Sequence, residues 1–424
     1  MAVEIACRSL AAVSQNQPGE PVFQALRITQ LHVTLANLQR LDQVKLSPIQ
    51  ANRLLSATWD ALRDYLIPDV NRMDDYTSSH RLAMRSLIYA LKIQVRRQDS
   101  TGDQRKLKEK RATLESDSPG LIGSQIIDQV ILRAVKSTII ALHEDQPATL
   151  TEELALATVI LQNAAKLQGL GQYYTEISMT AISEDVLRTL ANLFSWSRQI
   201  KKDDFPLFGQ YCSRLLLEFS RIPQLAEQMA IQGILGLLAN ASILGAIRQG
   251  TSAVQMPKLF SIWVDDILPI LLNVLSSVGK PVAQEVASFL NQFQARLEGS
   301  KNLWRDPEKI TRSQVKESHL LILLGKIFET FDCGKALALD LDVQELTSGM
   351  IFLLEGRKSG LKGRVVPTNE EELAMARTDG SGGMNKLETL VCNELLEMRV
   401  LALGSEGVRE ESVRRNTRGG SLRP

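Results

Sequence analysis

Residues that commonly perform catalysis or bind metals occur in this chain, but their spacing does not assemble a site. The four histidines lie far apart, and none stands in the H-E-x-x-H pattern that holds zinc. The four cysteines lie more than 50 residues apart, without metal-ligand, redox or disulfide spacing. These residues are His32, His80, His143, His319, Cys7, Cys212, Cys333 and Cys392. We expect no metal, no cofactor, and cysteines that serve as small apolar residues in a reducing compartment.

Phosphate-binding and acid–base patterns are also incomplete. The Gly-Lys pairs at 279–280, 325–326 and 334–335 are followed by Pro, Ile and Ala, so each lacks the hydroxyl that a Mg²⁺-nucleotide site uses. Two adjacent aspartates, as at 265–266, point about 100° apart on a helix and do not form a catalytic pair. We therefore expect a protein that is not an enzyme and that acts through binding surfaces.

Aromatic residues in the middle of the chain are the best candidates for such a surface. Core packing is the simple interpretation of each. The alternative is that some line slots between helices and receive phenylalanine rings from a disordered partner. The candidates are Phe205, Phe208, Tyr211, Phe260 and Trp263.

The elements that would position these residues are predicted to be helices throughout. Apolar residues recur at three- and four-residue steps, and Pro or Gly interrupts them at similar intervals, which is typical of armadillo and HEAT arrays. Residues 258–298 predict one such hairpin, with Pro269 bending its first helix. Residues 228–247 carry no charge, but their glycines, glutamines and Asn240 favour a broken buried helix over a membrane span. Val365-Val366 is the best strand candidate and is very short.

We predict one continuous all-α solenoid over residues 1–403. Residues 99–118 carry ten charges in twenty positions and read as a charged insertion. Residues 356–384 read as a long loop, in which Asn369 caps a short acidic helix. A last helix is expected at 385–403, and residues 404–424 as a disordered tail.

Charge and length limit the classes of function. The chain has 424 residues and a net charge of +1, so its overall charge gives no reason to expect a nucleic-acid or anionic-membrane binder. Glu4 and Arg8 interrupt the apolar N-terminus, so we expect no signal peptide and no transmembrane segment.

Three stretches resemble the C-terminal tail of the large inner-ring scaffold nucleoporins of fungi, in particular the nucleoporin 188 family, with the nucleoporin 192 family as nearest relative. They are GQYYTEISMTAISEDVLRTL at 171–190, FGQYCSRLLLEFSRIPQL at 208–225, and FSIWVDDILPILLNVLSSVGKPVAQEVASFLNQF at 260–293.

The resemblance implies a right-handed α-solenoid similar to nuclear transport receptors, located in the nuclear pore complex at the nuclear envelope. It further implies binding to linker nucleoporins and to phenylalanine–glycine repeats, a part in nucleocytoplasmic transport of proteins and mRNA, and a monomeric fragment of a longer protein. The alternative from the residues alone is a soluble HEAT- or armadillo-repeat adaptor or cargo carrier unrelated to the pore.

Overall fold

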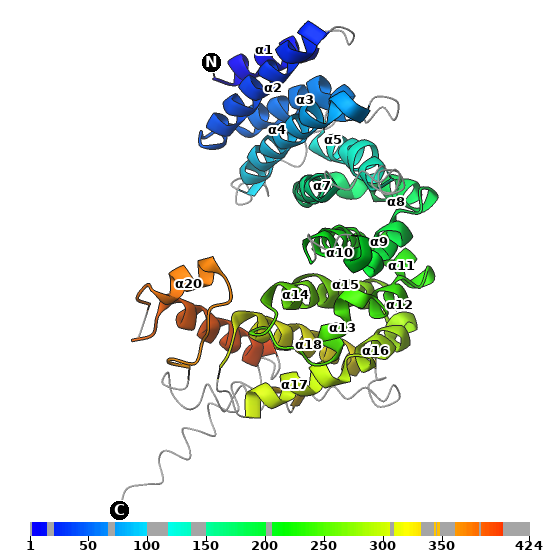
Figure 1. Ribbon diagram of the computed structural model, residues 1–424, viewed down its shortest axis with the longest axis vertical. Helices are drawn as coiled ribbons and strands as arrows, with labels where there is room; N and C mark the ends of the chain where they lie inside the picture. Colours follow the sequence, from blue (N-terminus) through cyan, green and yellow to red (C-terminus); the bar gives the residue numbers. More distant parts are fainter. Residues whose placement is uncertain are drawn as a thin grey trace, which may run out of the picture. The chain divides into compact units, whose positions relative to one another are not determined.

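The structure is a computed structural model that is helical almost throughout (Figure 1). It describes residues 2–14, 21–66, 73–99, 118–136, 150–200, 206–305, 309–331, 343–344, 346–347, 361–380 and 383–401. In these ranges, extended pairing is limited to two isolated β-bridges. One joins Val365 to Ile310, whose N–H donates to the Arg364 carbonyl at 2.8 Å. The predicted all-α class is confirmed, and the strand candidate forms only this bridge.

Many helices begin where the sequence places a proline. The ring fixes φ at a helical value, and its missing N–H lies in the first turn, where no intrahelical partner exists. These helices are α2 (Pro21–Asp42), α3 (Pro48–Leu66), α5 (Pro119–Ile126), α11 (Pro223–Ile231) and α14 (Pro257–Ser261). At α5 the Ser118 hydroxyl also accepts a hydrogen bond from the Leu121 N–H at 3.2 Å. Pro48, Pro119, Pro223 and Pro257, which are among the prolines that interrupt the apolar pattern, thus mark helix starts.

The chain divides into two compact units, which we describe separately. Unit 1 contains Met1–Leu193 and Lys201–Gln228, and unit 2 contains Phe194–Ile200 and Met229–Pro424. Helices α9 (Val186–Ile200) and α11 contribute residues to both. The prediction of one continuous array over 1–403 stays a prediction.

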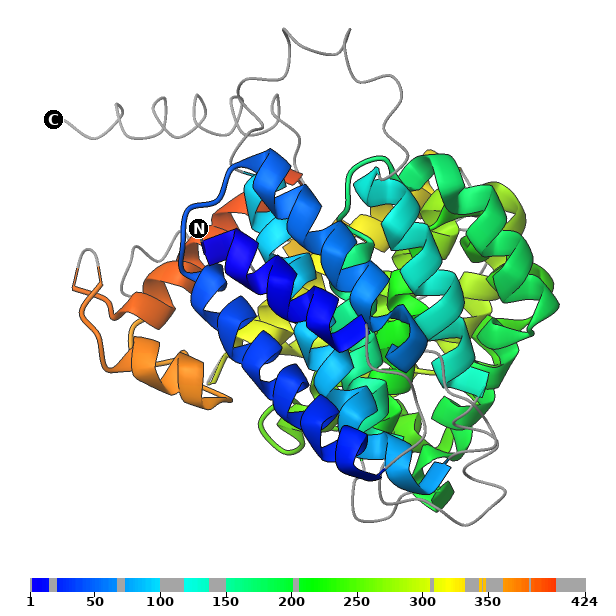
Figure 2. The same ribbon diagram turned by 90° about the horizontal axis from the view of Figure 1, so that it is seen from above.

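Unit 1 is a stack in which helices pack on their neighbours along the chain and on the next helix but one. Helix α1 packs on α2 and α3, and both α2 and α3 pack on α4; these helices are drawn in blue in Figure 2. Helix α7 packs on α4 and on α10. This is the contact pattern of helical repeats, in which each hairpin buries its apolar faces against the next. The remaining elements are α1 (Ala2–Ser14), α4 (Met73–Asp99), η2 (Ile127–Leu132), α7 (Leu150–Ala164), η4 (Leu170–Tyr173), α8 (Tyr174–Ser183) and α10 (Leu207–Ser220).

Unit 2 is built in the same way from shorter helices. Helix α12 packs on α16, α13 on α17, and both α15 and α17 on α18. The elements are α12 (Ile234–Ala239), η5 (Ser242–Leu244), α13 (Gly245–Arg248), α14, η6 (Ile262–Ile267), α15 (Leu268–Val278), η7 (Lys280–Val282), α16 (Ala283–Asn291), α17 (Gln294–Arg305), α18 (Arg312–Thr330), α20 (Glu370–Ala376) and a helix at 386–401.

The hairpin predicted at 258–298 is present. Its first helix runs continuously through α14, η6 and α15, and η6 is a π-helical segment directly before Pro269. A wider turn of this kind accommodates the carbonyl that proline leaves without an amide donor. Gly279, at φ 78°, then turns the chain into η7 and α16. The bend at Pro269 itself stays a prediction.

Two apolar stretches bear on the question of a membrane. The uncharged stretch 228–247 is broken into parts of α11, α12, η5 and α13, as predicted. Among the described helices, Pro257–Val278 is long and apolar enough to cross a membrane, but 67% of its most apolar window is buried inside the protein. A core helix that is largely buried inside a protein can be equally long and apolar.

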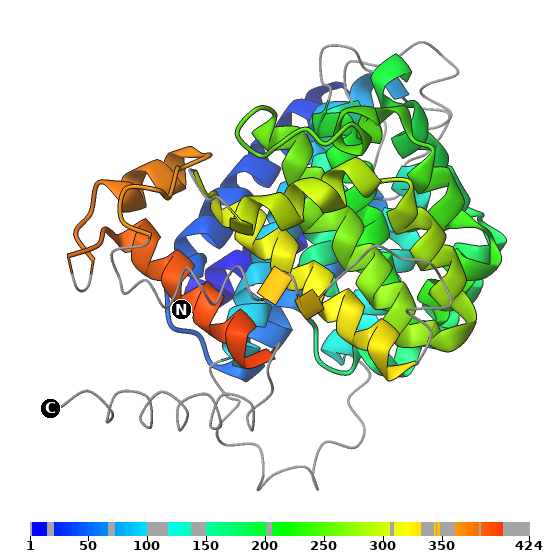
Figure 3. The ribbon, with the colours of Figure 1, turned by 90° about the horizontal axis from the view of Figure 1, so that it is seen from below.

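The C-terminal part of unit 2 contains the two predicted helices. The Asn369 side chain accepts a hydrogen bond from the Glu372 N–H at 2.8 Å and caps α20. Figure 3 shows α20 in orange beside the last helix in red. The predicted insertion, apart from its ends, and the predicted tail lie outside the described residues.

Candidate functional site: a buried polar network and the aromatic residues around it

The five aromatic candidates occupy different environments. Phe208, Phe260 and Trp263 have no exposed surface and pack in the cores of their units. Tyr211 is part-exposed on α10, and Phe205 lies outside the described residues. The three buried side chains are closed to a partner in this structure, so of the described candidates only Tyr211 is accessible. That any of them receives a phenylalanine ring stays a prediction.

Trp263 of η6 forms an aromatic cluster with Phe289 of α16 and with Phe293, which lies in the turn between α16 and α17. The Trp263 ring stacks on Phe293, with centroids 4.7 Å apart, and on Phe289, at 6.4 Å. Two guanidinium groups lie over aromatic rings here. The Arg248 guanidinium lies 5.5 Å from the ring centroid of Phe293, and the Arg296 guanidinium lies 5.1 Å from the ring centroid of Phe260. Cations over ring faces are favourable when both are shielded from water.

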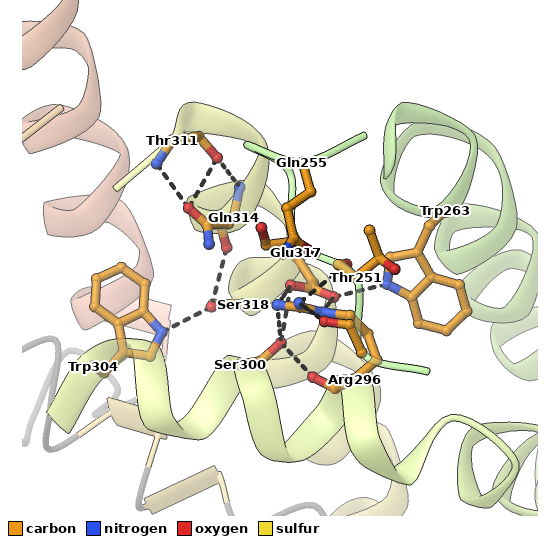
Figure 4. A network of polar contacts seen from close by, with 12 residues as sticks. Thr251, Gln255, Trp263, Arg296, Ser300, Trp304, Thr311, Gln314, Glu317 and Ser318 are labelled. Carbon is orange, nitrogen blue, oxygen red and sulfur yellow. Dashed lines mark hydrogen bonds and ion pairs between the residues drawn. The ribbon is translucent and has the colours of Figure 1, made fainter. Parts of the chain in front are cut away.

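The Glu317 carboxylate lies at the centre of the buried polar network (Figure 4). Arg296 donates from Nε to Oε1 and from Nη2 to Oε2, each at 2.9 Å, which is the two-pronged geometry that suits arginine and carboxylate. Trp263 donates from Nε1 to Oε1 at 2.8 Å, and the Ser300 hydroxyl donates to Oε2 at 2.9 Å. The side chains of Arg296 and Glu317 are 2% and 1% exposed, so each charge depends on the other.

A second chain of hydrogen bonds extends the network along α18. Trp304 donates from Nε1 to the Ser318 hydroxyl at 2.9 Å, and that hydroxyl donates to the Gln314 carbonyl at 3.1 Å. Thr311 and Gln314 cap the start of α18 by exchanging side-chain and backbone hydrogen bonds. Together these contacts join η6, α17 and α18 in unit 2.

This arrangement holds helices together rather than preparing a reaction. Each carboxylate oxygen of Glu317 accepts two hydrogen bonds, and the side chain is 1% exposed to water. Both charges of the pair are therefore occupied by partners within the protein. This network could not be recognised from the sequence, because Arg296 and Glu317 are 21 residues apart and each lies in a polar stretch typical of a surface.

Two other titratable groups are partly shielded from water. Burial raises the pKa of Glu218, while Arg221 beside it at 2.6 Å, and Lys166 and Arg214 farther away, act in the opposite direction. Burial lowers the pKa of His319, against the opposing effect of two nearby glutamates. Neither lies within a group of three or more His, Cys, Asp or Glu side chains that could hold a metal, and the described residues contain no such group.

The cysteines follow their predicted role in part. Cys212 is fully buried and free, and burial raises the pKa of its thiol. Cys7 and Cys392 are free and half-buried, and Cys333 lies outside the described residues.

Comparison with known proteins gives consistent matches. Residues 54–402 match the family described as nuclear pore protein NUP188 C-terminal domain. Nucleoporin NUP188 of Chaetomium thermophilum is 26% identical over 96% of this chain, and nucleoporin NUP188 of Saccharomyces cerevisiae is 25% identical over 42% of it. The chain covers 24% of the length of the first and 11% of the second.

A solved structure extends the similarity to the fold. A Nup188 fragment from Myceliophthora thermophila aligns with a TM-score of 0.65 and 28% identity, covering 85% of this chain and 99% of the fragment. The match therefore spans nearly the whole of that helical fragment.

Proposed function

Because the chain belongs to the NUP188 C-terminal domain family of nuclear pore proteins, we propose that it is a scaffold segment of the nuclear pore complex inner ring, located at the nuclear envelope. The observation that carries this proposal is the family match over residues 54–402. The helical fold supports it, because stacked hairpins expose extended surfaces without a reactive site.

The same proposal includes partners. The chain binds linker nucleoporins and the phenylalanine–glycine repeats of other nucleoporins, and it contributes in this way to nucleocytoplasmic transport. Burying one phenylalanine ring yields roughly 1.5–3 kcal/mol before the cost of ordering a flexible repeat is subtracted. Single contacts are therefore weak and fast, and several of them along one chain add avidity without trapping the partner.

Retention on immobilised phenylalanine–glycine repeats tests the repeat-binding part of the proposal. We expect the chain to be retained on these repeats and to pass through a matrix in which serine replaces phenylalanine. Tyr211→Ala should reduce retention, whereas Tyr173→Ala, which changes another part-exposed tyrosine of unit 1, should not. Equal retention on both matrices would remove repeat binding from the proposal and leave the scaffold role.

The runner-up is a soluble adaptor or cargo carrier with the same helical repeats. It differs from the scaffold in location, since an adaptor unrelated to the pore would not be held at the nuclear rim. Its distinguishing test is therefore localisation in cells.

A further inference from the structure

Helix α4 is enclosed by protein on all sides but one. From Arg81 to Gln98, contact with water is concentrated on one stripe of the helix, and outside this stripe every residue but the part-exposed Arg97 is buried. The residues of this stripe follow at helical spacing, so they lie on one face over about 22 Å at 1.5 Å per residue. They are Arg81, Arg85, Tyr89, Lys92 and Arg96.

The stripe carries more positive charge than its partners neutralise. Glu152 of α7 pairs with Arg81 at 2.8 Å and with Arg85 at 2.6 Å, and Asp42 of α2 pairs with Arg96 at 2.6 Å. Four cations therefore face two carboxylates. Lys92 lies between the two paired ends, 5.6 Å from the Tyr89 ring centroid, and it has no ion pair with a described residue.

Helix α7 adds apolar side chains beside this stripe. The pair Arg85–Glu152 joins the two helices at one end, and the Gln168 N–H donates to the Gln98 side chain at 3.2 Å at the other, so α4 and α7 run in the same direction. Counting equal steps from Arg85 and Glu152 places Tyr89 level with Leu156, and Lys92 level with Val159. Leu156 and Val159 are both part-exposed.

Helix α10, which also packs on α7, carries part-exposed aromatic and basic side chains. Its part-exposed residues include Tyr211 and Arg214, and the exposed Lys166 at the end of α7 lies near Glu218 of α10. The three neighbouring helices α4, α7 and α10 of unit 1 thus each carry part-exposed apolar or aromatic side chains.

We propose that this α4–α7 surface, formed by Arg85, Tyr89, Lys92, Arg96, Leu156 and Val159, binds an extended acidic peptide that carries apolar side chains. Charge complementarity identifies the occupant: the unpaired positive charge attracts carboxylates, and the half-buried side chains between the cations offer sites for apolar groups. A nucleic acid fits less well, because Glu152 would lie against its phosphates and the apolar row offers no contact to a backbone.

The spacing of the helices defines the peptide further. Packed helices lie about 8–10 Å apart, and an extended chain rises about 3.3 Å per residue. A peptide that crosses from α4 to α7 and α10 therefore passes one helix every three residues or so. Apolar residues at every third position, with Asp or Glu between them, match the surface.

Binding of a designed peptide tests the proposal on the full chain. The probe is a fluorescent peptide of about twelve residues, with Phe at every third position and Asp or Glu elsewhere, which follows from the helix spacing. Two control peptides replace the acids by Asn and Gln, or Phe by Ser, and a single-stranded DNA oligonucleotide is the competing ligand. We expect saturable binding of the probe that weakens with salt, and weaker binding of both control peptides.

Variants locate the binding on the protein. Lys92→Glu should weaken binding about tenfold at low salt, and Lys92→Gln about threefold, since charge pairs across an interface act on association and affinity. Arg188→Glu is the matched control, because Arg188 is exposed on the unit 1 part of α9, and it should leave affinity unchanged. Equal melting temperatures of all three variants establish that folding is not the cause.

Three results overturn the proposal: equal effects of Lys92→Glu and Arg188→Glu, tight binding of the amide peptide, or tighter binding of DNA than of the acidic probe. The inference rests on the proposed function only for the view that the chain is a binding platform. Its failure is distinguishable, because retention on phenylalanine–glycine repeats and location at the pore are measured without the acidic probe.

Discussion

Removal of the Glu317 carboxylate tests the buried network of unit 2 most sharply. Glu317→Ala leaves Arg296, whose side chain is 2% exposed, without its counter-charge, and it leaves the Trp263 N–H without its acceptor. Breaking a buried ion pair by removing one partner costs about 3–5 kcal/mol, most of it from the uncompensated charge. We expect a loss of unfolding free energy in this range.

Urea unfolding followed by tryptophan fluorescence measures this loss, because two tryptophans of the network are buried in unit 2. The double variant Arg296→Leu with Glu317→Leu should recover most of the stability, since a buried pair replaced by apolar residues is often neutral. Glu329→Ala is the control on the same helix: it breaks the exposed pair with Lys326 and should cost at most about 1 kcal/mol. A loss below about 1 kcal/mol for Glu317→Ala, or a double variant as unstable as the single one, would refute the reasoning.

Three further predictions concern stability. Trp263→Ala should cost about 3–5 kcal/mol in urea unfolding because the side chain is fully buried, and a smaller loss would contradict its core role. Gly120→Ala should destabilise by about 1–3 kcal/mol, because its Cβ would lie 2.4 Å from the Gly169 carbonyl carbon. Its control, Gly236→Ala in α12, meets open space and should stabilise by about 0.5–1 kcal/mol. Burial raises the pKa of Glu218, so the native state binds more protons there than the unfolded state, and this group's contribution to stability falls as pH rises through the raised pKa. The stability of Glu218→Gln relative to the unmodified chain should therefore increase as pH rises from the ordinary pKa of a glutamate through the raised pKa of Glu218. A difference in stability that stays constant with pH would exclude this effect.

Local signals in the sequence were sufficient for much of the fold. Prolines at 48, 119, 223 and 257 mark helix starts because the ring is compatible with the first turn and not with the interior. Asn369 predicted the cap of α20, because an asparagine side chain at a helix start can accept a hydrogen bond from the backbone N–H three residues later. Each of these features depends on a few consecutive residues, and such features can be recognised without knowing the packing.

The site depended on contacts between distant residues and was harder to predict. Phe260 and Trp263 lie on a helix that is covered on nearly every side, so an aromatic type alone did not separate a slot from the core. Arg296 and Glu317 meet only when α17 packs on α18, and their charges suggested a surface. The basic residues of α4 recur at helical spacing in the sequence. That they form the exposed stripe of the helix follows only from the burial of its other sides.

Fluorescence microscopy of this chain in cells tests whether it is a segment of the nuclear pore scaffold. In Saccharomyces cerevisiae, the matching segment of the NUP188 relative would be replaced by this chain, with a fluorescent label, in a strain that lacks the native copy. We expect a punctate ring at the nuclear rim, as strong as that of the labelled relative itself, and a weaker ring for the relative without the segment. Diffuse fluorescence of the chimera at a normal expression level, beside a normal ring of the intact relative, would contradict it.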